Sequence, residues 1–146
     1  MYSKRITYKD YDGNELTETF LFNLTKAEIV EMQLSTSGGF SERIQRIIDS
    51  QDVPEIIKTF KELILASYGE KSPDGKRFMK RAIDGHRLAD DFTQTEAYSE
   101  LFMELATNAD SATEFINKIV PQDAETAAAI KNQQIAIQDK VTPINQ

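Results

Sequence analysis

The chain of 146 residues contains no cysteine and only one histidine. The missing cysteines exclude disulfide bonds, thiolate chemistry and cysteine-based zinc sites, and one histidine cannot supply a histidine-rich metal site. No apolar run approaches the roughly 20 residues of a membrane-spanning helix, and the first ten residues lack the apolar segment of a signal peptide. We therefore expect a cytoplasmic protein with no cofactor and no membrane partner.

Charged residues are common but unevenly distributed. They make up 28% of the chain, and the net charge is −7. Residues 76–87 carry five basic side chains against one carboxylate, whereas residues 88–125 carry nine carboxylates against one lysine. An acidic protein repels nucleic acid over most of its surface, so we expect no nucleic-acid partner.

The first 24 residues predict a β-hairpin. Ile6 and Tyr8, and then Leu16 to Phe22, alternate with other residues as strands do. Between the two runs, Asp12-Gly13 supplies the positive φ angles of a hairpin turn. A lone hairpin is marginal in water, so this one must pack on the domain or pair with another chain. Its register stays open, because the residues around the turn allow loops of several lengths.

The next 45 residues predict three helices. Thr25 with Glu28 forms a capping box at the start of the first helix. Asp52 caps the longest helix, and Gly69 is expected to end it as the C′ residue. The apolar side chains at helical spacing in the second and third helices are Phe40, Ile44, Ile47, Ile48, Ile56, Ile57, Phe60, Leu63, Ile64 and Tyr68.

Two further amphipathic helices are predicted in residues 92–121, where a proline stops the second helix near its end. Thr93 with Glu96, and Ser111 with Glu114, have the spacing of capping boxes. The apolar stripes are Tyr98, Leu101, Phe102 and Leu105 in the first helix and Ala112, Phe115, Ile116 and Ile119 in the second.

The predicted fold class is α+β and mostly α-helical. A hairpin in residues 1–24 packs on about five to six short helices in residues 25–120. Within this core, residues 70–91 predict a basic arm or loop, because they contain two Asp-Gly turn sequences. Residues 121–146 predict a weakly helical to disordered tail.

Familiar catalytic and ligand-binding patterns are incomplete in this sequence. Residues 10–21 begin like a calcium-binding loop, but Glu15 and Leu21 occupy the places that need glycine and glutamate. Residues 37–41 are glycine-rich but lack the Gly-Lys-Ser/Thr of a phosphate loop. His86 has no evident nucleophile or orienting partner, so we expect an exposed loop histidine. We predict no catalytic, cofactor-binding or metal-binding residue, and not an enzyme.

The most unusual local pattern is a basic patch with an interleaved aromatic residue, formed by Lys76, Arg77, Phe78, Lys80 and Arg81. Three interpretations stay open. The patch could hold a nucleic-acid backbone or a stacked base. It could be a solvated arm whose aromatic residue docks on the core. It could also meet the acidic surface of the same protein, within the chain or in a neighbouring copy.

An acidic stripe is predicted on the helix that follows, where Glu96, Glu100 and Glu104 have i, i+4 spacing. Carboxylates in this arrangement can serve acid–base chemistry or a metal, but no histidine or asparagine is placed to complete such a site. We therefore favour a solvated or partner-facing stripe. Phe92 and Tyr98 of the same segment complete the set of candidate protein-interaction residues.

Two unusual strings carry a resemblance to a known family. They are YGEKSPDGKRF at residues 68–78 and FTQTEAYSELFMEL at residues 92–105. Together with their continuation through residues 115–117 to Pro121, they resemble tail assembly chaperones of long, non-contractile-tailed (siphovirus) bacteriophages. Residues 79–91 carry the resemblance least.

The resemblance implies a non-enzymatic chaperone that binds and solubilises the tape measure protein and helps to recruit tail tube (major tail) subunits. It also implies action in the host bacterial cytoplasm, absence from the mature virion, and a longer form of the same protein made by ribosomal frameshift. The short amphipathic helices and segments of opposite charge suit a homo-oligomer, independently of the resemblance.

Two alternatives to this function stay open. Residues 40–50 and 53–69 could form the helix-turn-helix of a small nucleic-acid-binding regulator, although the second helix carries as many acidic as basic residues beyond its cap. The other alternative is an adaptor or scaffold protein that the virion retains.

Overall fold

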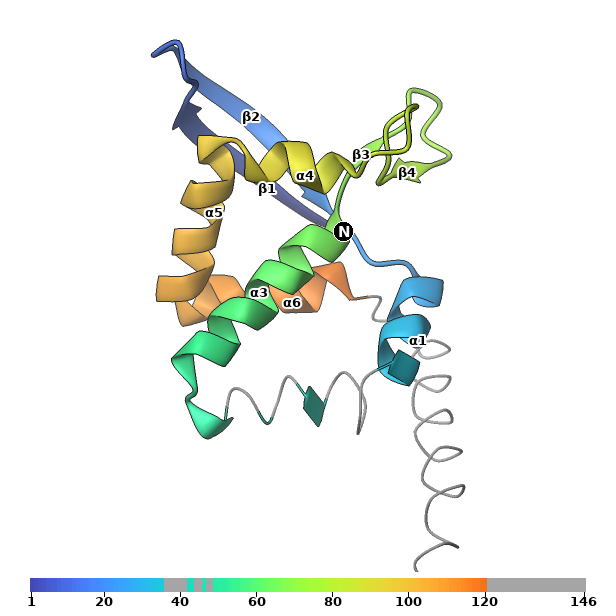
Figure 1. Cartoon of the computed structure of the whole chain (residues 1–146), viewed down its shortest axis with the longest axis vertical. Helices are drawn as coiled ribbons and strands as arrows, with labels where there is room; N and C mark the ends of the chain where they lie inside the picture. The colour runs from blue at the N-terminus through green and yellow to red at the C-terminus, as the bar shows by residue number, and fades with distance from the viewer. Residues whose placement is uncertain (36–41, 44–45, 47–48, 121–146) are drawn as a thin grey trace, which may run out of the picture.

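The computed structural model in Figure 1 describes residues 1–35, 42–43, 46 and 49–120. Its fold is α+β and mostly helical, as the sequence predicts. Four strands form one antiparallel sheet in the order β1-β2-β3-β4. In chain order the described elements are β1 (Tyr2–Lys9), β2 (Glu15–Phe22), α1 (Lys26–Ser35), α3 (Val53–Ser67), β3 (Tyr68–Lys71), β4 (Phe78–Met79), α4 (Leu88–Thr93), α5 (Glu96–Thr107) and α6 (Ala109–Ile119).

The first two strands form the predicted hairpin, and the structure settles its register. Tyr2 pairs with Phe22 at one end and Lys9 with Glu15 at the other. This register leaves five residues for the turn, where Gly13 takes a φ of +85°. An L side chain rarely adopts this angle, which explains the glycine of the Asp-Gly pair.

Two predicted helix starts are confirmed. The Thr25 hydroxyl accepts the backbone N–H of Glu28, and the Thr25 N–H donates to the Glu28 carboxylate at 2.9 Å, so a complete capping box opens α1. The Asp52 side chain accepts the backbone N–H of Glu55 at the start of α3. Each cap satisfies backbone donors that a helix start leaves without an intrahelical partner.

The predicted caps of the last two helices are wrong. Thr93 lies at the end of α4, and its hydroxyl donates to the Asp90 carbonyl, so Thr95 caps α5 instead. α6 begins directly after α5, and the one residue between them, Asn108, serves as its N-cap in place of Ser111. Both errors arise because the helices are closer together in the chain than the sequence pattern indicates.

Gly69 follows the C-cap Tyr68, as expected of the C′ residue, but it does not take the positive φ of a helix-ending glycine. α3 ends at Ser67, and the chain runs directly into β3, where Gly69 pairs with Leu21 of β2. A Cβ atom on Gly69 would lie 2.6 Å from the Phe78 ring and 2.7 Å from the Met79 carbonyl oxygen. A glycine is therefore needed here because β4 passes close to it, and not because a helix ends.

The hydrophobic core lies between the hairpin and the helices that pack on one another beside it. Phe22 is fully buried, with its ring centroid 5.8 Å from that of Phe115. Tyr68 stacks on Phe92 with centroids 4.5 Å apart. The predicted stripes of α5 and α6 are confirmed, because the buried side chains of these helices include Leu101, Leu105, Ala112, Phe115 and Ile119.

Some predictions lie outside the described residues. These are the glycine-rich loop at residues 37–41, the tail at residues 121–146 and the apolar stripe of the second predicted helix, Phe40, Ile44, Ile47 and Ile48; the described residues of that helix, 42–43, 46 and 49–50, are helical. The helix-turn-helix alternative depends on that second helix. None of the helices in the described part of the chain is both long and apolar enough to cross a membrane.

Candidate protein-interaction surface

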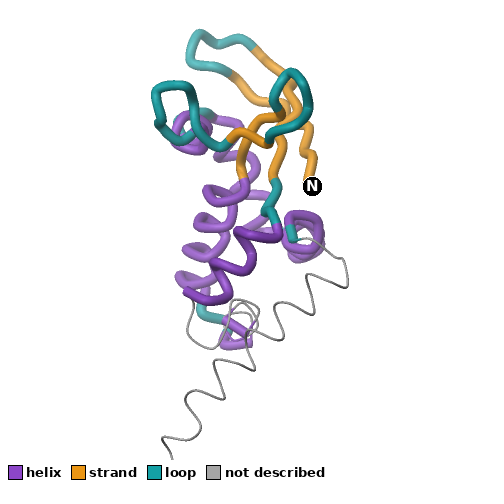
Figure 2. Tube along the Cα trace, turned by 90° about the vertical axis from the view of Figure 1, so that its right-hand side faces the viewer, coloured by secondary structure: helices purple, strands orange, loops and turns teal. Residues whose placement is uncertain are grey.

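Residues 70–87, which we call the arm, are built from two consecutive tight turns at one end of the molecule (Figure 2). The Gly75 N–H donates to the Ser72 carbonyl, and the Gly85 N–H donates to the Ala82 carbonyl, both at 2.9 Å. The two glycines have φ angles of +74° and +93°. With the β3–β4 pairing and an isolated β-bridge, these turns order a stretch that the sequence predicts only as a loop.

An aspartate fixes each turn. Asp74 accepts the Ser72 hydroxyl at 2.6 Å and the backbone N–H of Lys76 at 3.0 Å. Asp84 accepts the backbone N–H of His86 at 3.0 Å. These hydrogen bonds favour the ionised carboxylates and lower the pKa of both aspartates. The arm is thus held in shape by polar contacts rather than by a core of its own.

Lys80 anchors the arm to the body of the protein. Its ammonium donates to the Glu28 carboxylate at 2.6 Å and to the Ala66 carbonyl at 2.8 Å, and both charged side chains are about one-quarter to one-third exposed. Partial burial favours neutral Glu28, but hydrogen bonds from Lys80 and Thr25 outweigh this effect and lower the Glu28 pKa. Lys80 is therefore engaged within the chain, unlike the exposed patch residue that the sequence predicts.

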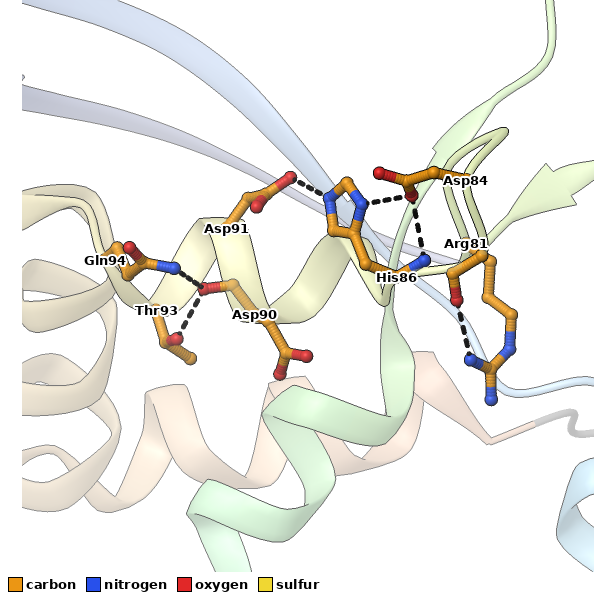
Figure 3. Close-up of polar contacts among 8 residues, drawn as sticks. Arg81, Asp84, His86, Asp90, Asp91, Thr93 and Gln94 are labelled. Carbon is orange, nitrogen blue, oxygen red and sulfur yellow. Dashed lines mark hydrogen bonds and ion pairs between the residues drawn. The ribbon is translucent and has the colours of Figure 1, made fainter.

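His86 joins the tip of the arm to α4 (Figure 3). Its Nδ1 lies 2.5 Å from Oδ1 of Asp84, and its Nε2 lies 2.7 Å from Oδ2 of Asp91. Hydrogen bonds to Asp91 and Asp84 outweigh slight desolvation and raise the pKa of His86 to about 8. The two carboxylates lie on opposite edges of the ring. Within the described ranges, no group of three or more His, Asp or Glu side chains is arranged to hold a metal ion.

An open groove, which we call the arm groove, lies along the arm. Its apolar lining is Phe78, Met79, Ala82, Ile83 and Leu88. Ile83 follows the first residue of a tight turn and is fully exposed, at 109%. Arg77 and Arg81 line the same groove, together with Glu70 and the Asp84 carboxylate that His86 already occupies. An apolar floor between arginines is typical of a protein contact surface.

A second exposed surface, which we call the α5 face, lies on the side of α5 away from the core. Met103 is 56% exposed, and the exposed side chains of Ser99 and Glu100 lie beside it at helical spacing. The opposite side of α5 packs against β1, α3, α4 and α6, so the α5 face points outward. It combines one flexible apolar side chain with a carboxylate.

The predicted acidic stripe is divided among different roles. Glu104 is half-buried, with an Oε2 atom 2.7 Å from the Lys4 ammonium. Glu96 accepts the Tyr11 hydroxyl at 2.8 Å. Both contacts tie α5 to the hairpin. Among the described residues, no hydrogen bond or ion pair holds the Glu100 carboxylate, so it is the member of the stripe that stays open to a partner.

Two predicted interaction residues point inward instead. Phe92 is 2% exposed within the core, so its predicted place on a contact surface is wrong. Tyr98 is half-buried and packs its ring against Phe92 at 5.8 Å between centroids. The sequence analysis groups both with the contact surface, whereas the structure places Phe92 in the core and half-buries Tyr98 against it.

The exposed apolar residues and the role of the histidine do not emerge from the sequence prediction. The exposure of Ile83 could have been predicted, because it directly precedes the turn sequence Asp84-Gly85 and turn residues are usually exposed. The exposure of Met103 could also have been predicted, because this residue lies off the apolar stripe of α5. The approach of Asp91 to His86 has no signal in the sequence, because it depends on where α4 begins.

The comparison with known families adds to these observations. The family of phage tail assembly chaperones matches residues 1–145. No match was found among curated proteins or among solved structures. The family match includes the hairpin, the arm and the α5 face. Because it spans nearly the whole sequence, the chain belongs to the phage tail assembly chaperone family.

Proposed function

We propose that this chain binds the tape measure protein, keeps it soluble and helps to recruit tail tube subunits to it during tail assembly. The family supports a role in tail assembly and contains chaperones rather than known enzymes. The proposal adds that the chain acts by binding alone, in the host bacterial cytoplasm and as a homo-oligomer. It also adds that a longer frameshifted form shares these residues, and that the protein leaves before the virion is complete.

The observation that carries the proposal is a pair of exposed surfaces of opposite charge on one molecule. The arm groove offers Ile83 between arginines, and the α5 face offers Met103 beside Glu100. A chain with two such surfaces can contact two proteins at once. Many copies, each adding a weak contact, would coat an elongated helical client far more firmly than one copy would.

The test is co-expression of tape measure protein segments with and without this chain. We expect the soluble fraction of the segments to rise several-fold with the wild-type chain. The rise should be smaller for a chain carrying Ile83→Asp and Met103→Asp. Lys58→Glu, an exposed change on α3 outside both surfaces, serves as the matched control. Equal solubility with and without the chain would contradict the proposal.

The timing of the role needs a separate measurement. Mass spectrometry of infected cells should detect this protein and a longer form with the same N-terminal peptides. Mass spectrometry of purified virions should detect neither. Stoichiometric amounts in the virion would support an adaptor or scaffold instead.

A further inference from the structure

We propose that the arm groove is a docking site for the α5 face of a second copy of this chain. The inference rests on the proposed function, because it names the contact through which the copies act together. The occupant is identified by its chemistry: an exposed apolar side chain on a helix, with a carboxylate next to it.

The groove has the chemistry to receive such a helix. Six basic side chains lie in the arm against three carboxylates. Within the described residues, no hydrogen bond or ion pair holds the guanidinium of Arg77, and that of Arg81 donates only to the Gly85 carbonyl, at 3.0 Å. Asp84, the negative group nearest the tip, is already bound by His86. Of the remaining charges that line the groove, the two arginines outnumber the one carboxylate, that of Glu70.

The α5 face has the complementary chemistry. Met103 is a flexible apolar side chain that adapts to irregular hollows, and Glu100 lies one turn from it on the same side of the helix. Seating Met103 among the apolar groove residues places Glu100 close to the arginines. An arginine–carboxylate pair at the rim orients such a contact and speeds its formation more than it adds affinity.

This contact cannot form within one chain. In Figure 1 the arm lies to the right and α5 to the left, and α4 runs between them. Within the described residues two cations of the arm have ion-pair partners in the same chain, Lys80 with Glu28 and Arg87 with Asp90, and neither partner lies on α5. A groove on one side that accepts a face on the other gives a head-to-tail contact, which continues into rings or open filaments rather than stopping at a dimer.

Charge reversal on each surface tests the contact without any client. The arm variant carries Arg77→Glu and Arg81→Glu, and the face variant carries Ser99→Lys and Glu100→Lys. All four positions are exposed, and Lys58→Glu is the control for a charge change elsewhere. Light scattering over a range of concentrations should show wild type growing beyond a dimer. Each variant alone should need an at least tenfold higher concentration to assemble, because like charges then face each other.

Mixing the two variants shows whether the arm and the α5 face contact each other directly. In an equal mixture, the reversed arm of one variant meets the reversed face of the other, and the native arm meets the native face. Assembly should therefore return in the mixture and weaken with salt. A wild type that stays monomeric, variants that assemble like wild type, or a mixture that fails to assemble would each overturn the inference. Because no client is present, these outcomes are independent of the solubility test above.

Discussion

The core and the arm of this protein are held together by different forces. The core buries aromatic rings from the hairpin, α4 and α6 against one another, with Phe22 and Phe115 fully buried. The arm buries little and instead depends on turn glycines, aspartate hydrogen bonds and the anchor of Lys80. Apolar burial stabilises in proportion to area, whereas exposed polar contacts each contribute little.

The difference explains where the contact surface lies. A region stabilised by burial must hide its apolar side chains, and the core leaves few for a partner. A region stabilised by backbone turns is free to expose an apolar side chain such as Ile83 at no cost to its own fold. A substitution in the core should therefore change stability, and one at the arm tip should change only binding.

The largest expected effect comes from the core. Phe22→Ala should lower the free energy of unfolding by about 3–5 kcal/mol, because the ring is fully buried among four other aromatic rings. Ile83→Ala should change it by less than about 0.5 kcal/mol. Urea unfolding followed by circular dichroism measures both. Similar losses from the two variants would refute the contrast between core and arm.

A smaller effect is expected where the arm joins the sheet. Gly69→Ala places a Cβ atom against the Phe78 ring and the Met79 carbonyl oxygen, so β4 must shift, at a cost of about 1–3 kcal/mol. The matched control is Gly85→Ala, which also has a positive φ with open space around it but lies in a turn that does not join β3 to β4, so it should leave β4 in place. Amide hydrogen exchange reports on β4 directly. Faster exchange of the β4 amides in both variants would show that the close contact is not what matters.

The contact that anchors the arm, made by Lys80, should contribute still less to the free energy of unfolding. Lys80→Met removes the donor to Glu28 and to the Ala66 carbonyl, and it should cost about 1 kcal/mol, since the pair is partly exposed. The lowered Glu28 pKa means that this contribution is present above pH 4.5, the ordinary pKa of glutamate, and is lost as pH falls through the lower native value. Unfolding of wild type and variant from pH 7 to pH 3 should converge. The exposed Lys76→Met is the control.

The elements that the sequence predicts well are those in which apolar residues recur many times at a regular spacing. The hairpin and α3, α5 and α6 each show enough repeats of a two-residue or helical spacing to define a buried face. β4 has only two residues and therefore no period to detect. α4 has six residues and no side-chain cap, so in the sequence Thr93 at its end resembles the start of the next helix.

The contact surface is harder to predict for a related reason. The basic character of the arm is visible in the sequence, but which cations are available depends on contacts between distant residues. Lys80 finds Glu28 across 52 positions of the chain, and Lys4 finds Glu104 across 100. No local pattern indicates such pairs. Sequence alone therefore predicts the charge of each surface, but it does not predict which charged side chains are left without a partner in the same chain.

The smallest expected effect concerns the tie between the arm tip and α4. A neutral imidazole has one N–H, so only protonated His86 can donate to both Asp84 and Asp91. Its pKa is raised from 6.5 to about 8, so the tie is fully present below pH 6.5 and is lost as pH rises through about 8. The protection of the amides in the turn at residues 82–85, measured against the intrinsic exchange rate at each pH, should fall over this range. NMR titration of the ring gives the pKa directly.

Asp91→Asn is the sharpest variant for this tie, because the hydrogen bond to Asp91 is the largest cause of the raised pKa. The ring pKa should fall toward 6.5, while the turn keeps the backbone hydrogen bond from His86 to Asp84. Asp90→Asn, which removes a neighbouring charge that pairs with Arg87, should shift the pKa less. If Asp90 and Asp91 variants shift it equally, the general negative charge at the start of α4 raises the pKa, and the arm tip is held by its own turn alone.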